Sequence, residues 1–214
     1  MIVDAIFGVG TLAAFRRSRR RFSARRAAIV SPAEAVVGGD ARVRGRLVAD
    51  GLVEAPLTQR RCAFWAARIA ELAFVATANG DSVRHWQTAY EGTSTAPFWL
   101  VGDDGARILV APTEERGAVD LTAELEDVGE HPRVNDDNPR FGAFLRGRGV
   151  SPTAFMGIAG DARFAELVLN EGHAVEVYGA VDEIAVVERG GYRDGATSVR
   201  RVVGTADAPI LLRA

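Results

Sequence analysis

The side chains that most often perform chemistry are sparse in this chain. It contains one cysteine, Cys62, and three histidines, His85, His131 and His173. The histidines are not spaced as metal ligands on one helix or hairpin, and a single cysteine cannot build a zinc module or an internal disulfide. All 26 basic residues are arginine, which excludes a lysine Schiff base and the lysine of a phosphate-binding loop. We therefore expect no metal and no cofactor.

The other residues that could be catalytic have structural explanations. No G-x-S-x-G motif is present to hold a nucleophilic serine. Asp103 and Asp104 are adjacent, so a turn explains them better than a pair of cooperating carboxylates. Cys62 lies in an apolar run and is expected to be a buried hydrophobic side chain. The sequence favours a non-catalytic protein and indicates no catalytic residue, while a hydrolase or transferase whose site forms only in the folded chain stays open.

The N-terminal segment combines an apolar stretch with a cluster of arginines. Residues 1–30 carry seven arginines and one acid, a net charge of +6, whereas the remaining residues carry 19 arginines and 27 acids, a net charge of −8. Ile2–Phe15 is apolar apart from Asp4, and arginines follow it directly. As a helix this stretch would reach about 21 Å, which is shorter than the roughly 30 Å hydrocarbon core of a bilayer.

The order of apolar and then basic residues predicts a membrane anchor, either lying in the interface or forming a shortened span with arginines at the headgroups. The positive-inside rule then places the body of the protein on the cytoplasmic side. A helix that packs on the body is the alternative. The residues assigned to the anchor are Ile2, Val3, Ile6, Phe7, Leu12, Phe15, Arg16, Arg17, Arg19, Arg20 and Arg21. The expected domains are an anchoring helix over residues 1–30 and a β-rich body over residues 31–214.

The body has the patterns of short strands joined by turns. In Ala41–Ala49 arginines alternate with apolar residues and glycine, which is typical of a half-buried antiparallel strand. Cys62–Ala73 is apolar at nearly every position, which favours a strand buried on both faces, although its alanines also suit a helix. Gly102–Gly105, with the sequence GDDG, separates two apolar runs and predicts a tight hairpin.

Two helical segments are also expected in the body. Ser31–Glu34 has the residues of a helix start, and the glycines at 38 and 39 would end that helix after one or two turns. Apolar residues at helical spacing predict an insertion around residues 138–160. Further short strands are expected at His173–Gly179, Ile184–Val187, Val199–Val203 and Ile210–Leu212. The predicted fold is mostly β, an antiparallel barrel or sandwich for which an OB-like barrel is one option, with a short helical insertion and an N-terminal helix.

Several of these blocks, taken in order, resemble the BAM (beside-a-membrane) or GIDE domain of membrane-anchored RING-type ubiquitin ligases and their prokaryotic relatives. The blocks are Val43–Val48, Ala55–Thr58 with Arg61–Trp65, Phe98–Val101 with Asp103–Gly105, and Arg163–Glu166 followed by Gly172 and Val175–Gly179. Gln59 and Arg61 stand where this family usually has glycine and proline. The residues that match the family motifs are Pro56, Leu57, Cys62, Asp104, Gly105, Arg163, Glu166, Gly172 and Gly179.

The resemblance implies a membrane-associated, cytoplasm-facing module that interacts or regulates without catalysing a reaction. The label of ubiquitin ligase would apply by family name only, because one cysteine cannot form a RING. The expected partners are a membrane lipid surface and an unidentified protein. An OB-like protein that binds nucleic acid is the alternative, and the net charge of −8 on the body disfavours it because such a body repels phosphate.

Overall fold

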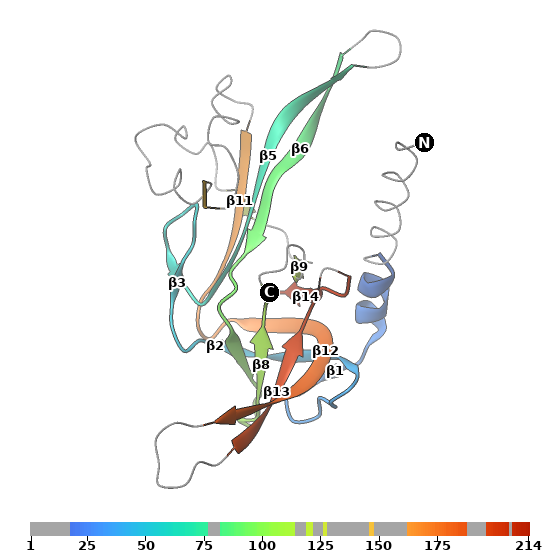
Figure 1. Ribbon diagram of the computed structural model, residues 1–214, viewed down its shortest axis with the longest axis vertical. Helices are drawn as coiled ribbons and strands as arrows, with labels where there is room; N and C mark the ends of the chain where they lie inside the picture. The colour runs from blue at the N-terminus through green and yellow to red at the C-terminus, as the bar shows by residue number, and fades with distance from the viewer. Residues whose placement is uncertain are drawn as a thin grey trace. The chain divides into compact units, whose positions relative to one another are not determined.

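We describe the protein from a computed structural model, which is mostly β and so confirms the predicted fold class (Figure 1). The structure describes residues 18–76, 82–113, 119–121, 126–127, 146–147, 162–187, 196–205 and 207–214. Residues 18–26 form a helix. The chain divides into two compact units, the first comprising Met1–Gly51, Thr95–Ala123 and Asn170–Ala214, and the second comprising Leu52–Ser94 and Glu124–Leu169.

The first unit is centred on a closed barrel of five strands, as the sequence predicted in outline. Its members are β2 (Asp40–Val48), β7 (Phe98–Val101), β8 (Arg107–Ala111), β12 (Ala174–Val187) and β13 (Ala196–Val203). The strands pair in the order β2, β7, β8, β13 and β12, and β12 pairs back with β2 to close the ring. The pair β8–β13 is parallel and the other four are antiparallel. Three short strands extend this sheet, namely β1 (Ile29–Val30), β9 (Val119–Leu121) and β14 (Ile210–Arg213).

Alternation along β2 separates the inside of the barrel from the outside. Val43 and Leu47 are fully buried, whereas Arg44 and Arg46 are exposed. On the paired strand, Val177 lies opposite Val43 and is also fully buried. The period of two residues predicted from the sequence therefore sorts apolar side chains into the core and guanidinium groups onto the outer surface.

The C-terminal half of the barrel differs from the prediction. The segments His173–Gly179 and Ile184–Val187 were expected to be separate strands, but residues 174–187 form one strand, β12, which curves around the barrel in Figure 1. A Cβ atom at Gly179 would lie 2.6 Å from Cγ1 of Val202. Gly179 is therefore needed where β12 packs closely on β13, and a sequence pattern does not reveal such a close approach.

The hairpin predicted at Gly102–Gly105 is confirmed. It joins β7 to β8, which pair in antiparallel register. Gly105 has a φ of 79°, a left-handed conformation that favours glycine, and Asp104 Oδ1 accepts a hydrogen bond from the Ala106 N–H at 2.9 Å. These two residues explain why the local sequence was sufficient to locate this turn.

The helix predicted from Ser31–Glu34 is wrong. Its capping contacts do form, since the Ser31 N–H donates to Glu34 Oε2 at 2.8 Å and the Glu34 N–H donates to the Ser31 carbonyl at 3.1 Å. The chain makes only a turn there, at residues 32–34. The Gly38 N–H donates to the Val181 carbonyl and the Val181 N–H donates to the Gly39 carbonyl, so pairing with β12 takes the backbone groups that a longer helix would need.

The second unit is built around an antiparallel sheet in the order β10, β11, β5 and β6. Its strands are β5 (Phe64–Ala76), β6 (Ser82–Thr93), β10 (Glu126–Asp127) and β11 (Ala162–Leu169), with a separate pair of β3 (Val53–Glu54) and β4 (Arg61–Cys62). β5 and β6 form a long hairpin (Figure 1). For Cys62–Ala73 the strand interpretation is confirmed and the helix alternative is wrong, because pairing with both β11 and β6 encloses β5 on two sides.

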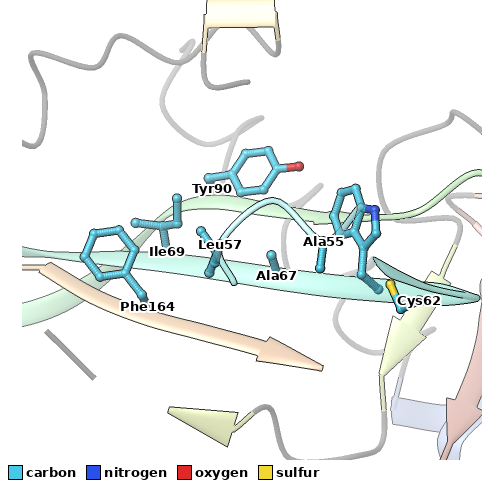
Figure 2. Packing of buried hydrophobic residues seen from close by; sticks show 8 residues of the cluster. Ala55, Leu57, Cys62, Ala67, Ile69, Tyr90 and Phe164 are labelled. Atoms are coloured by element: carbon cyan, nitrogen blue, oxygen red, sulfur yellow. The ribbon is translucent and has the colours of Figure 1, made fainter. Parts of the chain in front are cut away.

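The core of the second unit gathers residues from the turn after β3 and from β4, β5, β6 and β11. Figure 2 shows this cluster, with Leu57, Ala67 and Ile69 lying between Phe164 and Cys62. Its buried members are Ala55, Leu57, Cys62, Trp65, Ala67, Ile69, Tyr90 and Phe164. The predicted helical insertion at residues 138–160 lies outside the described residues, apart from residues 146 and 147, which are helical.

Candidate functional site

The residues that match the family motifs fall into two separate groups. Pro56, Leu57, Cys62 and Glu166 come together in the second unit. The others belong to the first unit: Asp104 and Gly105 in the β7–β8 turn, Gly172 at a φ of 82° before β12, and Gly179 within β12. Arg163 belongs to β11, where its backbone lies opposite Ala70, and its side chain is outside the described structure.

Glu166 holds the turn that follows β3. Its side chain is buried, and its carboxylate accepts hydrogen bonds from the Leu57 N–H at 2.9 Å, the Thr58 N–H at 3.0 Å and the Thr58 hydroxyl. Buried polar groups need such partners, so one carboxylate satisfies two backbone donors that would otherwise be lost. This group fixes a turn to β11 and is a structural contact.

Cys62 lies beside this carboxylate, in the same buried cluster. Burial raises the pKa of the Cys62 thiol to about 11, and the negative charge of Glu166 adds to the increase. A thiol with this pKa is protonated at neutral pH, and only the thiolate is a good nucleophile. Cys62 therefore acts as a hydrophobic core residue.

Gln59 has an unusual backbone conformation in the same turn. Its φ is 57°, in the left-handed region, where L-residues other than glycine are strained. Its N–H donates to the Ala55 carbonyl at 2.9 Å, which closes the turn. The sequence resemblance placed glycine at this position in the family, and the observed φ gives a physical reason for such a preference.

Among the anchor residues, Ile2–Arg17 lie outside the described structure, and Arg19, Arg20 and Arg21 begin the helix of residues 18–26. Arg20 is only 14% exposed and its Nη1 lies 3.1 Å from Asp40 Oδ2. Its Nε donates to the Pro209 carbonyl at 2.9 Å, and its guanidinium lies 5.2 Å from the centre of the Tyr178 ring. These contacts fasten the helix to the barrel strands β2 and β12.

Arg21 adds a second contact of this kind. Its Nη2 and Nε donate to the two carboxylate oxygens of Asp120 at 2.6 and 2.9 Å. Arg19 is exposed. Within the residues that the structure describes, no helix is both long enough and apolar enough to cross a bilayer.

A pocket of about 550 Å³ lies between this helix and the barrel. Four arginines line it, Arg21 and Arg25 from the helix, Arg42 from β2 and Arg213 from β14, together with the carboxylate of Glu176 from β12. Leu211 contributes apolar lining. The pocket is thus strongly basic, although the body as a whole is acidic.

Glu176 is the centre of the charge arrangement on this face. Arg42 donates two hydrogen bonds to its Oε2, at 3.0 and 2.6 Å, and Arg44 donates two to its Oε1. Burial raises the pKa of the Glu176 carboxyl, but the hydrogen bonds and charges of Arg44 and Arg42 outweigh it, so the net pKa lies below the ordinary value of 4.5. Glu176 therefore stays charged at neutral pH.

This pocket was not predicted from the sequence. The arginines at 42, 44 and 46 were interpreted as a solvated strand face, with a phosphate-binding stripe as the alternative, and Glu176 was noted only within the block Val175–Gly179. The alternation of arginines along β2 indicated a basic strand face. It could not indicate a pocket, because β12, β14 and the helix that complete the pocket come from distant segments. In the described residues no group of three or more histidine, cysteine or acidic side chains could hold a metal ion, and the pocket instead has the donors for binding an anion.

Comparison of the chain with protein-family models, with curated proteins and with solved structures finds no match.

Proposed function

We propose that this protein is a membrane-associated, non-catalytic interaction module of the BAM/GIDE type, with its body on the cytoplasmic side. The observation that carries the proposal is the docking of the arginine-rich helix on the barrel. Arg20 and Arg21 bind Asp40 and Asp120, so the segment that directly follows the apolar stretch Ile2–Phe15 in sequence is fixed to the folded body.

With the helix fixed in this way, an N-terminal membrane anchor would also set the orientation of the barrel. A bilayer-inserted segment continuing into residues 18–26 would present the barrel at a defined angle, whereas a loose linker would not. Phe22 is 55% exposed on this helix, and Val36 is 74% exposed in the segment between β1 and β2. Exposed apolar side chains beside arginines are the composition that interfacial helices use at lipid headgroups.

The barrel itself we assign to the OB-like class. Five strands that close into one ring, with the first strand paired to both the second and the fourth, match a small Greek-key barrel. In this barrel β2 is the first strand and pairs with β7 and β12, and the only parallel pair among its five strands joins β8 to β13. The second unit then occupies two insertions, one between β2 and β7 and one between β8 and β12.

Flotation of the full chain with phospholipid vesicles tests the membrane proposal. We expect the wild-type protein to float with the vesicles and the double variant Ile6→Asp/Phe7→Asp to stay in the soluble fraction, because two carboxylates in the apolar stretch oppose insertion. The matched control is Leu52→Asp/Val83→Asp, which places the same charges on two exposed apolar residues of the body. Equal flotation of the wild type and the Ile6/Phe7 variant would overturn the proposal.

Binding of single-stranded nucleic acid is the second candidate, and one observation favours it. On the outer face of β7 and β8, the Arg107 guanidinium lies 5.1 Å from the centre of the Trp99 ring, and stacked aromatic and arginine side chains bind unpaired bases. Titration with a single-stranded oligonucleotide at low salt tests this candidate. If wild type binds and Trp99→Ala does not, the nucleic-acid function gains support over the membrane module.

A further inference from the structure

Two guanidinium groups in the basic pocket have no counter-charge among the described residues. Arg25 and Arg213 both line the pocket and both are exposed. Neither side chain has a hydrogen bond, an ion pair or a ring contact within the part of the chain that the structure describes. The other two arginines of the pocket are paired, Arg21 with Asp120 and Arg42 with Glu176.

The pairing register explains why Arg213 has no carboxylate. On β12, Glu176 lies opposite Arg44 of β2 on one side and opposite Arg213 of β14 on the other. A carboxylate has about four acceptor positions. Arg42 and Arg44 fill all four, two on each oxygen. Glu176 is therefore saturated, and Arg213 faces the pocket with its donors available.

Arg25 lies close to another arginine on the same face of the helix. It follows Arg21 by four residues, so both side chains lie on the same face of the helix, and both line the pocket. Like charges at this spacing destabilise a helix by a few tenths of a kcal/mol. Asp120 binds Arg21 but not Arg25, so one positive charge of this pair remains uncompensated.

The size and lining of the pocket indicate what could compensate these charges. Its volume of about 550 Å³ falls in the range of small-molecule sites and is larger than a single inorganic anion requires. Guanidinium forks match phosphate oxygens, and a phosphate group offers both more charge and more acceptors than a carboxylate. Leu211 provides an apolar wall for the organic part of a ligand.

We propose that this pocket binds a small molecule that carries phosphate, through Arg25 and Arg213. Arg21 and Arg42 form the rest of the basic wall, while Asp120 and Glu176 hold those two side chains in place. The source of the phosphate is either a soluble phosphate compound or the headgroup of an anionic phospholipid. The site does not require the membrane attachment proposed above, since none of the residues that line the pocket belongs to the apolar stretch Ile2–Phe15.

The test is calorimetric titration of the full-length protein with pyrophosphate, in the presence of a mild detergent. We expect the wild type to bind and the double variant Arg25→Gln/Arg213→Gln to lose about 10- to 100-fold in affinity, because the variant lacks both guanidinium groups that would donate charge-assisted hydrogen bonds to phosphate. The control is Arg60→Gln/Arg61→Gln, which removes the same charge from two exposed arginines of the second unit and leaves the pocket intact. Its affinity should stay within about twofold of the wild type.

Folding is checked on the same samples. Because neither Arg25 nor Arg213 has a side-chain hydrogen bond or ion pair with the described residues, the thermal unfolding curve of the double variant should match that of the wild type without ligand. With matching curves, equal pyrophosphate affinity of the wild type and the Arg25/Arg213 variant overturns the site. Absence of pyrophosphate binding by the wild type, together with absence of any preference for phosphatidic acid, overturns it as well.

Vesicles distinguish the two sources of phosphate. Phosphatidylcholine vesicles with and without phosphatidic acid are compared in the flotation assay. If phosphatidic acid strengthens flotation of the wild type but not of Arg25→Gln/Arg213→Gln, the headgroup is the ligand. If only pyrophosphate responds to these substitutions, the ligand is soluble. Binding of an oligonucleotide alone, sensitive to the same substitutions, would overturn the assignment to a small molecule.

The two proposals fail separately in these assays. The variant Ile6→Asp/Phe7→Asp should bind pyrophosphate as the wild type does, because its changes are outside the pocket. Loss of flotation with retained pyrophosphate binding would support both proposals. Retained flotation with no pyrophosphate or phosphatidic acid dependence would support the membrane module and overturn the phosphate site.

Discussion

Among the described residues, each unit of the protein has one buried glutamate, and the two carboxylates accept hydrogen bonds from different kinds of donor. In the second unit Glu166 accepts hydrogen bonds from two backbone N–H groups and a hydroxyl. In the first unit Glu176 accepts four hydrogen bonds from Arg42 and Arg44. The first arrangement uses a charged group to hold neutral backbone, and the second uses it to organise a positively charged surface.

This difference separates structure from recognition. The donors around Glu166 belong to one turn and are enclosed in the core, where they can serve only that turn. The donors around Glu176 are half-buried or exposed side chains beside a pocket, and further arginines line the same pocket. The contacts of Glu166 therefore stabilise the second unit, whereas the face around Glu176 carries the pocket for which we propose a ligand.

Removing Glu166 should have the largest effect on stability. Glu166→Ala leaves the N–H groups of Leu57 and Thr58 without acceptors next to the core, and each such loss costs about 1–3 kcal/mol. We expect the free energy of unfolding to fall by about 2–5 kcal/mol in urea titrations. Glu91→Ala, which removes an exposed partner of Arg68 in the same unit, is the control and should cost less than about 1 kcal/mol. Equal losses for the two variants would show that the turn does not depend on Glu166.

Arg20 is expected to have the next largest effect, because it carries most of the helix contacts. Arg20→Gln loses the ion pair with Asp40, the cation–π contact with Tyr178 and the hydrogen bond from Nε to the Pro209 carbonyl. The free energy of local opening of the helix should fall by about 1–2 kcal/mol. Hydrogen exchange of the amides of residues 18–26 would measure this decrease. Arg19→Gln, on the same helix and exposed, serves as the control and should leave exchange unchanged. Similar exchange in both variants would refute the docking contact.

Acid should weaken the first unit through Glu176. The folded-state pKa of this carboxyl lies below its ordinary value of 4.5, so its contribution to stability is complete above that value and is lost as the pH falls through the folded pKa. Wild type should exceed Glu176→Gln in unfolding free energy by about 1 kcal/mol at neutral pH, and the difference should shrink below about pH 4.5. Urea titrations of both proteins across this range provide the measurement, and a difference that grows in acid would contradict the sign.

Substitution of Gln59 should have the smallest effect on stability, and it should raise stability where the other variants lower it. Gln59→Gly relieves a left-handed backbone conformation at a φ of 57°, at the expense of a more flexible unfolded chain. We expect the free energy of unfolding to rise by about 0.5–1 kcal/mol. Thermal unfolding of the variant, beside Gln59→Ala as the control that keeps the strain, measures it. A lower melting temperature for the glycine variant would show that the strain at Gln59 is compensated by its side-chain contacts.

Features set by neighbouring residues could be predicted from the sequence. The hairpin at Gly102–Gly105 follows from an Asp-Gly pair between apolar runs, and β2 follows from its alternating pattern. The strand β6 was missed: Val83, Arg84 and Trp86 are exposed, and Tyr90 is the buried hydrophobic side chain among its described residues, so the strand shows no alternating apolar stripe. The strand forms because it pairs with β5 along its length, and its own sequence does not indicate this pairing.

The sequence by itself determined the class of the fold, the burial of Cys62 and the concentration of positive charge near the N-terminus, because composition, period and turn chemistry are local properties of the chain. Only the tertiary structure decided which charges meet. Arg42 and Glu176 are 134 residues apart, and Arg20 and Pro209 are 189 residues apart. Barrel closure and helix docking bring these groups within hydrogen-bonding distance, and that register is fixed by packing across the whole unit, which no short pattern contains.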